Sequence, residues 1–198
     1  MPVTSVSYFA EGWGVGEVWF DGERLVWHEL PRPRSETPAR PETHRGTRAR
    51  TRVTPSQKGG GKRPPPTRST IAAKSAPARR ENASEVQDLV DRLEEYFSGK
   101  RVSFADVELD LDGWTPFQLD VVKALRQVPY GEVVSYRDLA RLAGHPRAQR
   151  AAGTFCARNR FALVVPCHRV VASDGLGSYG SLGIAYKQRL LALEGVSL

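Results

Sequence analysis

The first thirty residues alternate hydrophobic and polar side chains in short runs that predict strands. The runs 17–20 and 25–27 flank Asp21-Gly22-Glu23. An Asp-Gly pair between two such runs is a strong hairpin signal, because glycine adopts the positive φ that a tight turn requires. We therefore expect residues 1–30 to form an N-terminal β-hairpin part.

Helical spacing replaces this alternation after residue 80. Residues 84–87 read Ser-Glu-Val-Gln, a pattern that can form a capping box at a helix start. Gly99 is predicted to end this helix, and residues 107–111 are predicted as a short strand. Residues 81–112 would then complete a reduced N-terminal domain. The apolar residues of the helix recur three and four positions apart, at Val86, Leu89, Val90, Leu93, Tyr96 and Phe97.

The pattern of residues 113–198 predicts a mainly helical domain. One helix starts at Thr115 with proline in its first position, and residues 135–138 start a shorter one. After the break at 144–146, residues 147–158 form a second helix with small side chains and arginines. Helix, short turn, helix is the outline of a helix-turn-helix motif. The pattern alone leaves open whether the small residues serve helix packing or close approach to a narrow surface.

Charge separates the middle of the chain from both ends. Residues 31–80 hold nine of the fourteen prolines and carry 14 Lys/Arg against 2 Asp/Glu, a net +12 in a chain of +7. Such a composition buries too little apolar surface to offset the entropy of ordering, so it predicts a disordered basic linker. Residues 113–198 carry 11 basic and 5 acidic side chains, a net +6. Both segments suit a polyanion such as nucleic acid, and a merely solubilising role for the middle stays open.

Cysteine content and hydropathy exclude several classes of protein. The two cysteines, Cys156 and Cys167, are too few for a secreted disulfide scaffold or a structural zinc site. No apolar run approaches the roughly 18–20 residues of a membrane span, and no signal peptide is apparent at the N-terminus. We therefore expect a cytoplasmic protein that holds no metal and contacts no membrane, with Cys156 in its core.

Cys167 is the candidate for chemistry. It lies in the run Pro166-Cys167-His168-Arg169, between the apolar segments 163–165 and 170–171, which we expect to be buried and extended. A thiol reacts as its thiolate, and a neighbouring histidine or arginine lowers its pKa. A general base also needs a group that orients it, and Glu194 in the C-terminal helix is a candidate. These residues alone leave open an inert, buried Cys167.

The run from Pro166 to Val171 resembles the active-site signature of the O6-alkylguanine-DNA alkyltransferases, also called methylated-DNA–protein-cysteine methyltransferases. The resemblance extends in order over residues 113–198. It implies an α+β fold with a mainly helical, winged-helix-like C-terminal catalytic domain that contains the helix-turn-helix. It also implies a monomer without cofactor that acts on double-stranded DNA with alkylated bases. The further matching segments are Thr115–Gln118, Val128–Gly131, Ser135-Tyr136, Asn159 and Leu193–Gly195.

The resemblance also implies roles for single residues. Cys167 would take the alkyl group from O6-alkylguanine, with O4-alkylthymine as a further candidate, and would be used up in doing so. His168 would deprotonate Cys167 through a bound water, and Glu194 would hold His168 in the required tautomer. Tyr136 would offer its phenol to the departing guanine. This division of labour parallels that of a Ser-His-Asp triad.

Contacts with the flipped base and the duplex follow from the same resemblance. Asn159, Pro166 and the carbonyl of Val170 would form the substrate side of the pocket, with Asn159 bracing the second helix and the active-site turn. Arg150 would enter the space that the flipped nucleotide leaves. The second helix would lie in the minor groove. The remaining residues assigned to DNA are Ala148, Ala151, Gly153 and Ser135.

Two features depart from the family's pattern. The N-terminal domain is reduced, and the loop Gly180–Gly183 differs from the usual run of small residues. A non-catalytic protein that binds alkylated lesions and flags them for other repair factors is therefore the alternative hypothesis. A cysteine hydrolase is a third, although no separate oxyanion signal supports it.

Overall fold

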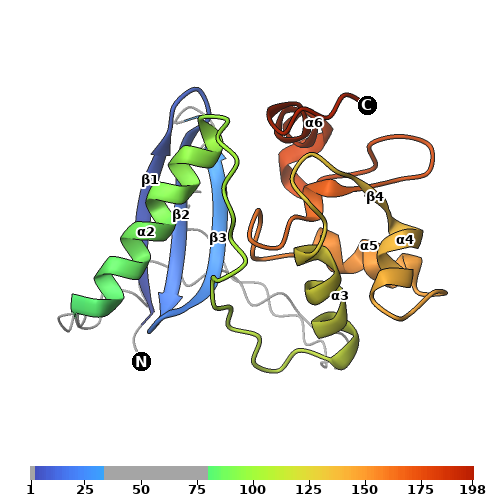
Figure 1. Cartoon of the computed structure of the whole chain (residues 1–198), viewed down its shortest axis with the longest axis horizontal. Helices are drawn as coiled ribbons and strands as arrows, with labels where there is room; N and C mark the ends of the chain where they lie inside the picture. The colour runs from blue at the N-terminus through green and yellow to red at the C-terminus, as the bar shows by residue number, and fades with distance from the viewer. Residues whose placement is uncertain (1–2, 34–79) are drawn as a thin grey trace, which may run out of the picture.

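The computed structural model describes residues 3–33 and 80–198. Its N-terminal part is an antiparallel sheet in the order β1-β2-β3, formed by β1 (Thr4–Ala10), β2 (Gly14–Asp21) and β3 (Arg24–Arg32). Helix α2 (Arg80–Phe97) lies across one face of this sheet (Figure 1). The predicted disordered linker, residues 31–80, lies outside the described residues except at its two ends.

The predicted hairpin is the β2–β3 pair, whose turn places Gly22 at a φ of 64°. The structure adds one strand, because β1 pairs with β2 from Thr4↔Phe20 to Ala10↔Gly14. Gly14 is required where β2 begins: its φ is +110°, and a Cβ there would lie 2.0 Å from the carbonyl oxygen of Arg32. We expected a two-stranded hairpin for residues 1–30, whereas the structure has a three-stranded sheet.

Helix α2 begins at Arg80, so the predicted start at Ser84 is wrong. Residues 80–83 read Arg-Glu-Asn-Ala, and most of these residue types favour a helix, which extends it by a turn. The predicted apolar stripe is confirmed in its buried members, of which Leu89, Leu93 and Tyr96 are almost completely inaccessible to solvent. This stripe packs against the sheet and fixes where the end of α2 meets the rest of the molecule.

The predicted strand at residues 107–111 is wrong. The segment makes one isolated bridge, Leu25↔Leu109, with hydrogen bonds from Leu25 N to Glu108 O and from Asp110 N to Leu25 O. A second isolated bridge, His28↔Phe161, occupies the same edge of β3 further along. Because two different segments share this edge, neither continues beside β3 as a regular strand.

The C-terminal part is mainly helical. Its helix α3 begins as predicted, with a complete capping box between Thr115 and Gln118. Helices α4 and α5 pack against each other and against α3, and α5 falls within the predicted range 147–158 (Figure 1). The predicted α+β class is confirmed. The elements are α3 (Pro116–Arg126), α4 (Tyr136–Leu142), α5 (Gln149–Ala157), the short 3-10 helices η2 (Cys167–Arg169) and η3 (Gly180–Leu182), and α6 (Gly183–Leu193).

A short parallel pair of strands aligns two parts of the catalytic region. Strand β4 (Val134–Ser135) pairs with β5 (Val170–Val171) in the register Val134↔Val170 and Ser135↔Val171. Because α4 begins directly after β4 and η2 ends directly before β5, the pairing holds Tyr136 near the turn that carries Cys167.

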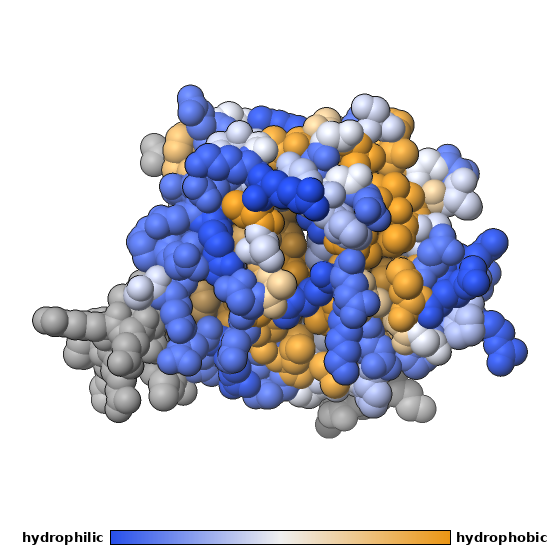
Figure 2. All heavy atoms as spheres, viewed as in Figure 1, coloured by the Kyte–Doolittle hydropathy of each residue, from blue (hydrophilic) through white to orange (hydrophobic). Residues whose placement is uncertain are grey.

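The two parts of the molecule share one hydrophobic core. On the face shown in Figure 2, hydrophobic residues come into view between the two parts and also over the C-terminal part, among hydrophilic residues. His28 on β3 joins the parts directly, since its Nδ1 donates to the carbonyl of Ala162 at 2.6 Å and its Nε2 accepts from the Tyr8 hydroxyl at 2.7 Å. Within the described residues, no helix is long and apolar enough to cross a membrane.

Candidate active site

Cys167 is the first residue of η2, and the expectation of extended segments on both sides of it is confirmed only after it, where residues 170–171 form β5, and is wrong for residues 163–165. Residues 163–165 form turns and bends, with Leu163 at a φ of 67° and Val165 N donating to Phe161 O at 2.7 Å. The apolar residues of this run favour a strand locally, but the hydrogen bonds of the turn outweigh that preference. Left-handed backbone at a residue other than glycine is uncommon and is often found at functional sites.

Asn159 holds this turn together. Its Nδ2 donates to the Val165 carbonyl at 2.7 Å and lies 3.1 Å from Cys167 Sγ, while its Oδ1 accepts from the Phe161 amide at 3.0 Å. The side chain therefore braces the active-site turn and also touches the thiol. Its link to α5 runs through its backbone amide, which donates to Cys156 O at 3.3 Å.

The thiol of Cys167 is 6% exposed, and this burial raises its pKa because the thiolate loses its solvation. The hydrogen bond from Asn159 and the charge of Lys187 oppose this effect only in part. Cys167 is thus a protonated thiol at rest and needs a base to react. Cys156, the other cysteine, is half-buried at the edge of the core, and burial raises its pKa as well.

His168 is completely buried, and its Nε2 lies 2.8 Å from Glu194 Oε1. Burial lowers the pKa of the imidazole, against the opposing effect of Glu194, so the ring is neutral. A neutral ring that faces a carboxylate carries its proton on Nε2. Its Nδ1 has no hydrogen-bond partner among the described residues, and the lone pair there can accept a proton.

Glu194 is the last member of this relay and lies at the C-cap of α6, one position beyond the helix in which we expected it. Burial raises the pKa of its carboxyl, but hydrogen bonds from His168 and Arg169 and the charge of Arg169 hold that pKa well below its usual range. The carboxylate is therefore ionised and can stabilise a positive imidazole. Gly131 N also donates to its Oε2 at 3.2 Å.

Arg169 serves Glu194 rather than the thiol. Its Nε and Nη2 donate to Glu194 Oε2 and Oε1, both at 2.9 Å, and its Nη1 donates to Val128 O at 2.7 Å. A two-pronged contact of this kind fixes the plane of the carboxylate. Arg169 follows Cys167 closely in the sequence, but its partner is Glu194 and not the thiol.

Tyr136 is half-buried at the first position of α4. Burial raises its pKa to about 12, and the neighbouring thiols of Cys156 and Cys167 add to the shift. The phenol stays protonated, so it can donate a hydrogen bond. Gly153 on α5 lies against the ring, since a Cβ there would be 3.8 Å from two of its carbons.

Three buried polar side chains near the site were not predicted. Lys187 is completely buried, and its Nζ donates to the carbonyls of Val170 and Leu176 at 2.5 Å each. The resemblance assigns the Val170 carbonyl to contact with guanine. Lys187 occupies one lone pair of this carbonyl oxygen, and the second lone pair stays available. The spacing of Lys187 from Leu190 and Leu191, on the buried stripe of α6, is the signal that could have revealed it.

The other two are tyrosines. The Tyr179 hydroxyl is buried close to the Cys167 thiol, and burial together with this neighbour raises its pKa. The Tyr96 hydroxyl donates to Glu194 Oε1 at 2.7 Å. The helical pattern identified Tyr96 only as an apolar position. No local signal in the sequence points to either role.

The residues predicted to meet DNA lie on the α4–α5 pair. Arg150 and Ala151 are exposed on α5, whereas Ala148 and Gly153 are half-buried. The Ser135 hydroxyl is already engaged as the N-cap of α4, accepting from Asp138 N at 3.1 Å and donating to Asp138 Oδ2 at 2.6 Å. Pro166 is buried directly before η2. The exposed arginines in α4, in α5 and directly beside them are Arg137, Arg141, Arg147, Arg150 and Arg158.

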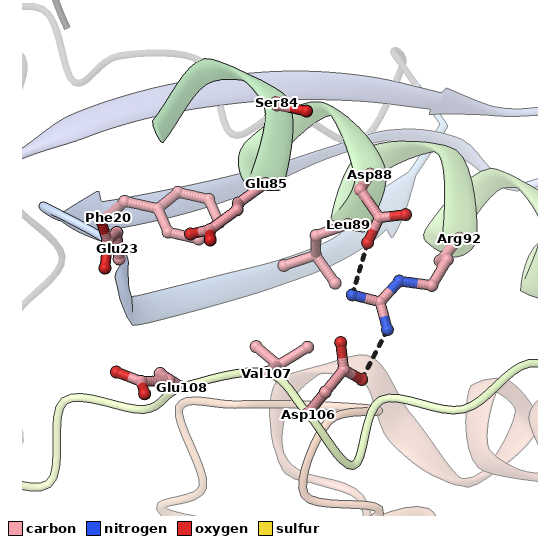
Figure 3. A pocket seen from close by; sticks show the side chains of 10 residues that line it. All are labelled: Phe20, Glu23, Ser84, Glu85, Asp88, Leu89, Arg92, Asp106, Val107 and Glu108. Atoms are coloured by element: carbon pink, nitrogen blue, oxygen red, sulfur yellow. Dashed lines mark hydrogen bonds and ion pairs between the residues drawn. The ribbon is translucent and has the colours of Figure 1, made fainter. Parts of the chain in front are cut away.

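A pocket of about 540 Å³ lies elsewhere, between α2, the β2–β3 turn and residues 106–108 (Figure 3). Its central cation, Arg92, pairs with Asp88 and Asp106 at 2.7 Å each. Neither a cysteine nor a histidine lines this pocket. The ion pairs hold α2 against the segment that follows it, and the pocket takes no part in the site at Cys167.

A buried cysteine followed by a His–Glu pair, beside two short helices with exposed arginines, is the arrangement expected of a protein class that combines a cysteine nucleophile with a surface for nucleic acid. Comparison with known proteins makes this specific. Residues 116–196 match the DNA-binding domain of 6-O-methylguanine DNA methyltransferase, and residues 67–111 match its ribonuclease-like domain. The chain belongs to the 6-O-methylguanine DNA methyltransferase family.

Individual relatives agree with this assignment. Methylated-DNA–protein-cysteine methyltransferases of Methanosarcina barkeri and Metallosphaera sedula are 47% and 44% identical over 115 and 107 residues. The alignments cover 58% and 54% of this chain and 71% and 66% of those relatives. The crystal structure of Mycobacterium tuberculosis O6-methylguanine methyltransferase is 31% identical with a TM-score of 0.64, covering 97% of this chain and 92% of that one. A structure of the same organism's protein in complex with DNA gives a TM-score of 0.60 at 31% identity, over 98% and 92% of the two chains.

Proposed function

We propose that this protein repairs DNA directly by moving the alkyl group of O6-alkylguanine in duplex DNA onto Cys167. The observation that carries the proposal is the buried relay in which Glu194 holds His168 while the Nδ1 lone pair remains available. O4-alkylthymine is a second candidate lesion. The names of the relatives support the same reaction class.

The first step is the activation of the thiol. His168 accepts the proton of Cys167 at Nδ1, relayed by a water, and becomes positively charged. The ionised Glu194, fixed by Arg169, stabilises that charge in a buried environment where Coulomb interactions are strong. The pair therefore offsets the burial that otherwise keeps Cys167 protonated.

The second step is the displacement. The thiolate attacks the alkyl carbon, and the C–O bond breaks with its electron pair remaining on the guanine. Tyr136, with its phenol protonated, is the donor to the leaving ring. Overall, the proton of the thiol ends on the repaired guanine, and Cys167 becomes a thioether. Because a thioether is a stable bond, each molecule acts once.

The proposal also covers the binding mode. The lesion is flipped out of the duplex, α5 lies in the minor groove, and Arg150 enters the vacated space. We propose that the protein does this as a monomer and in the cytoplasm, where its free cysteines stay reduced. Sequence-independent contacts suit the task, because a lesion can occur in any sequence.

Mass spectrometry of the intact protein tests the reaction. After incubation with a duplex containing O6-methylguanine, we expect each molecule to gain one methyl group in place of one hydrogen. Cys156→Ala should retain the gain, and Cys167→Ala should lose it. Tight lesion binding without any mass gain would instead indicate the non-catalytic binder, which the intact Cys167 does not favour.

A further inference from the structure

The relay at Cys167 receives one side chain from outside the catalytic region. Tyr96 lies near the end of α2, which packs on the N-terminal sheet, and is only 1% exposed. Its hydroxyl is 2.7 Å from Glu194 Oε1 and 3.4 Å from His168 Nε2. Because the His168 N–H already points at the carboxylate, the short contact with Glu194 is the one in which Tyr96 donates.

The direction of this hydroxyl is fixed by packing. The Tyr96 ring meets the Phe97 ring at 89° with 5.4 Å between centroids, and the Tyr130 ring at 81° with 6.2 Å. It also stands at 70° to the imidazole of His168, 6.5 Å away. A ring enclosed by such edge-to-face contacts has no freedom to turn its hydroxyl elsewhere.

The hydroxyl has no packing function of its own at this depth. A phenylalanine would fill the same space on the apolar stripe of α2, and burying a polar group is unfavourable unless it forms a hydrogen bond. Tyr96 forms that bond with the carboxylate of the relay. We infer that Tyr96 is a positioning residue for alkyl transfer, through which the N-terminal part fixes Glu194 against His168.

This inference rests on the proposed function and has a consequence for proton affinity. Glu194 Oε1 is shared by Tyr96, His168 and Arg169. Removing the neutral donor leaves more of the negative charge facing His168, so the positive imidazole becomes more stable and more of it is protonated near neutral pH. A protonated His168 cannot accept the thiol proton, and a less constrained carboxylate orients the ring less well.

The other groups that face the relay stay in place when only this hydroxyl is removed. Arg169 contacts both carboxylate oxygens, and the charge of Lys187 acts on His168 from α6. Cys167 precedes His168 in η2, and Tyr130 faces Glu194 from the loop after α3. A change in the titration of His168 in Tyr96→Phe therefore reports the lost hydroxyl.

The test compares Tyr96→Phe with Tyr8→Phe in the full chain. Tyr8 is a matched control, because it is also buried in the N-terminal part and its hydroxyl contacts a different histidine, His28, rather than His168 or Glu194. Three quantities are measured: the single-turnover rate of methyl transfer against pH, the affinity for the same duplex, and the titration of His168 by NMR in the free protein. Thermal unfolding is recorded for both variants.

For Tyr96→Phe we expect the single-turnover rate of methyl transfer to be about fivefold lower at neutral pH. This is the change in rate that the loss of one hydrogen bond typically produces. The acid limb of the rate profile and the titration of His168 should both move to higher pH, with duplex affinity unchanged. Tyr8→Phe should lower stability without moving either titration.

Two results would overturn the inference: an unchanged rate profile in Tyr96→Phe, or an equal change in Tyr8→Phe. A different result, no methyl uptake by the wild-type protein, would refute the proposed function and with it a role for Tyr96 in alkyl transfer. The NMR titration of the free protein would then still show whether Tyr96 controls the proton affinity of His168, which separates the two failures.

Discussion

Cys167 and Cys156 show why the surroundings of a thiol matter more than its presence. Burial raises the pKa of both thiols, so neither is reactive by itself. Only Cys167 adjoins a neutral histidine that is held by an ionised carboxylate. The sequence named His168 and Glu194 as a candidate base and its orienter, and the structure brings these two side chains into contact.

Glu194→Gln tests the electrostatic part of this relay. The amide keeps the size of the side chain but cannot stabilise a positive His168, so we expect methyl transfer to slow by about 10²-fold or more. Quenched single-turnover reactions followed by mass spectrometry measure the rate. Glu132→Gln, an exposed carboxyl in the same region, is the control and should react like the wild type. Equal rates for both variants would rule out the role assigned to Glu194.

At the scale of elements, the α4–α5 pair combines two requirements on one short motif. Helix α5 buries Ala152 and Phe155 toward the core and presents Arg150 and Ala151 to solvent. The start of α4 places Tyr136 near the thiol, with Gly153 of α5 against its ring. Gly153 therefore serves close packing against Tyr136 on one side of α5. The proposed contact with a minor groove concerns the exposed side of the helix, which carries Ala151.

Arg150→Ala should separate base flipping from chemistry. If Arg150 enters the space left by the flipped nucleotide, its loss should slow repair of a duplex by roughly tenfold, as expected for one arginine contact to nucleic acid. Reaction with the free base O6-methylguanine needs no flipping and should be unaffected. Rates with both substrates are compared in the same protein preparation. An equal loss on both would place Arg150 in the chemistry or in folding instead.

At the scale of the whole molecule, the N-terminal sheet is joined to the catalytic turn rather than merely preceding it. His28 of β3 contacts Ala162, and its backbone amide donates to Arg160 O at 2.8 Å. Tyr96 of α2 reaches Glu194. One contact reaches the residues next to the active-site turn and the other reaches Glu194, so the N-terminal part supports the site.

His28 should make stability depend on pH in a defined window. Burial lowers its pKa from 6.5 to about 4, so between these values the unfolded chain binds more protons and stability falls as pH falls. We expect this one group to contribute a loss of about 2 kcal/mol between pH 7.5 and pH 5. Urea unfolding at both pH values measures it.

The matched variant for this experiment is His28→Gln. The buried His168, whose pKa is also lowered, adds a loss of the same sign in both proteins, so the difference between them isolates His28. The variant should be less stable at pH 7.5 but lose less stability on acidification. If both proteins lost the same free energy of unfolding between pH 7.5 and pH 5, the pH dependence could not be assigned to His28.

The sequence by itself determined the features that depend on neighbouring residues. The capping box at Thr115 positions α3, the apolar spacing of α2 identifies its buried face, and the run around Cys167 indicates the chemistry. Each of these signals acts over a few residues, within one turn of backbone. The prediction was wrong where other hydrogen bonds outweighed a local preference for a strand, through Leu25 at residues 107–111 and within the turn at residues 163–165.

Only the tertiary structure decided which groups meet at the thiol. Tyr96 contacts a carboxylate 98 positions away, and Arg169 turns from its neighbour Cys167 to Glu194. Lys187 is buried on two carbonyls that belong to other segments. Such partnerships arise when two packed parts exclude water and buried polar groups must find partners in whatever surrounds them. Spacing along the chain can indicate that a side chain is buried, as for Lys187, but it does not specify which partners that side chain meets.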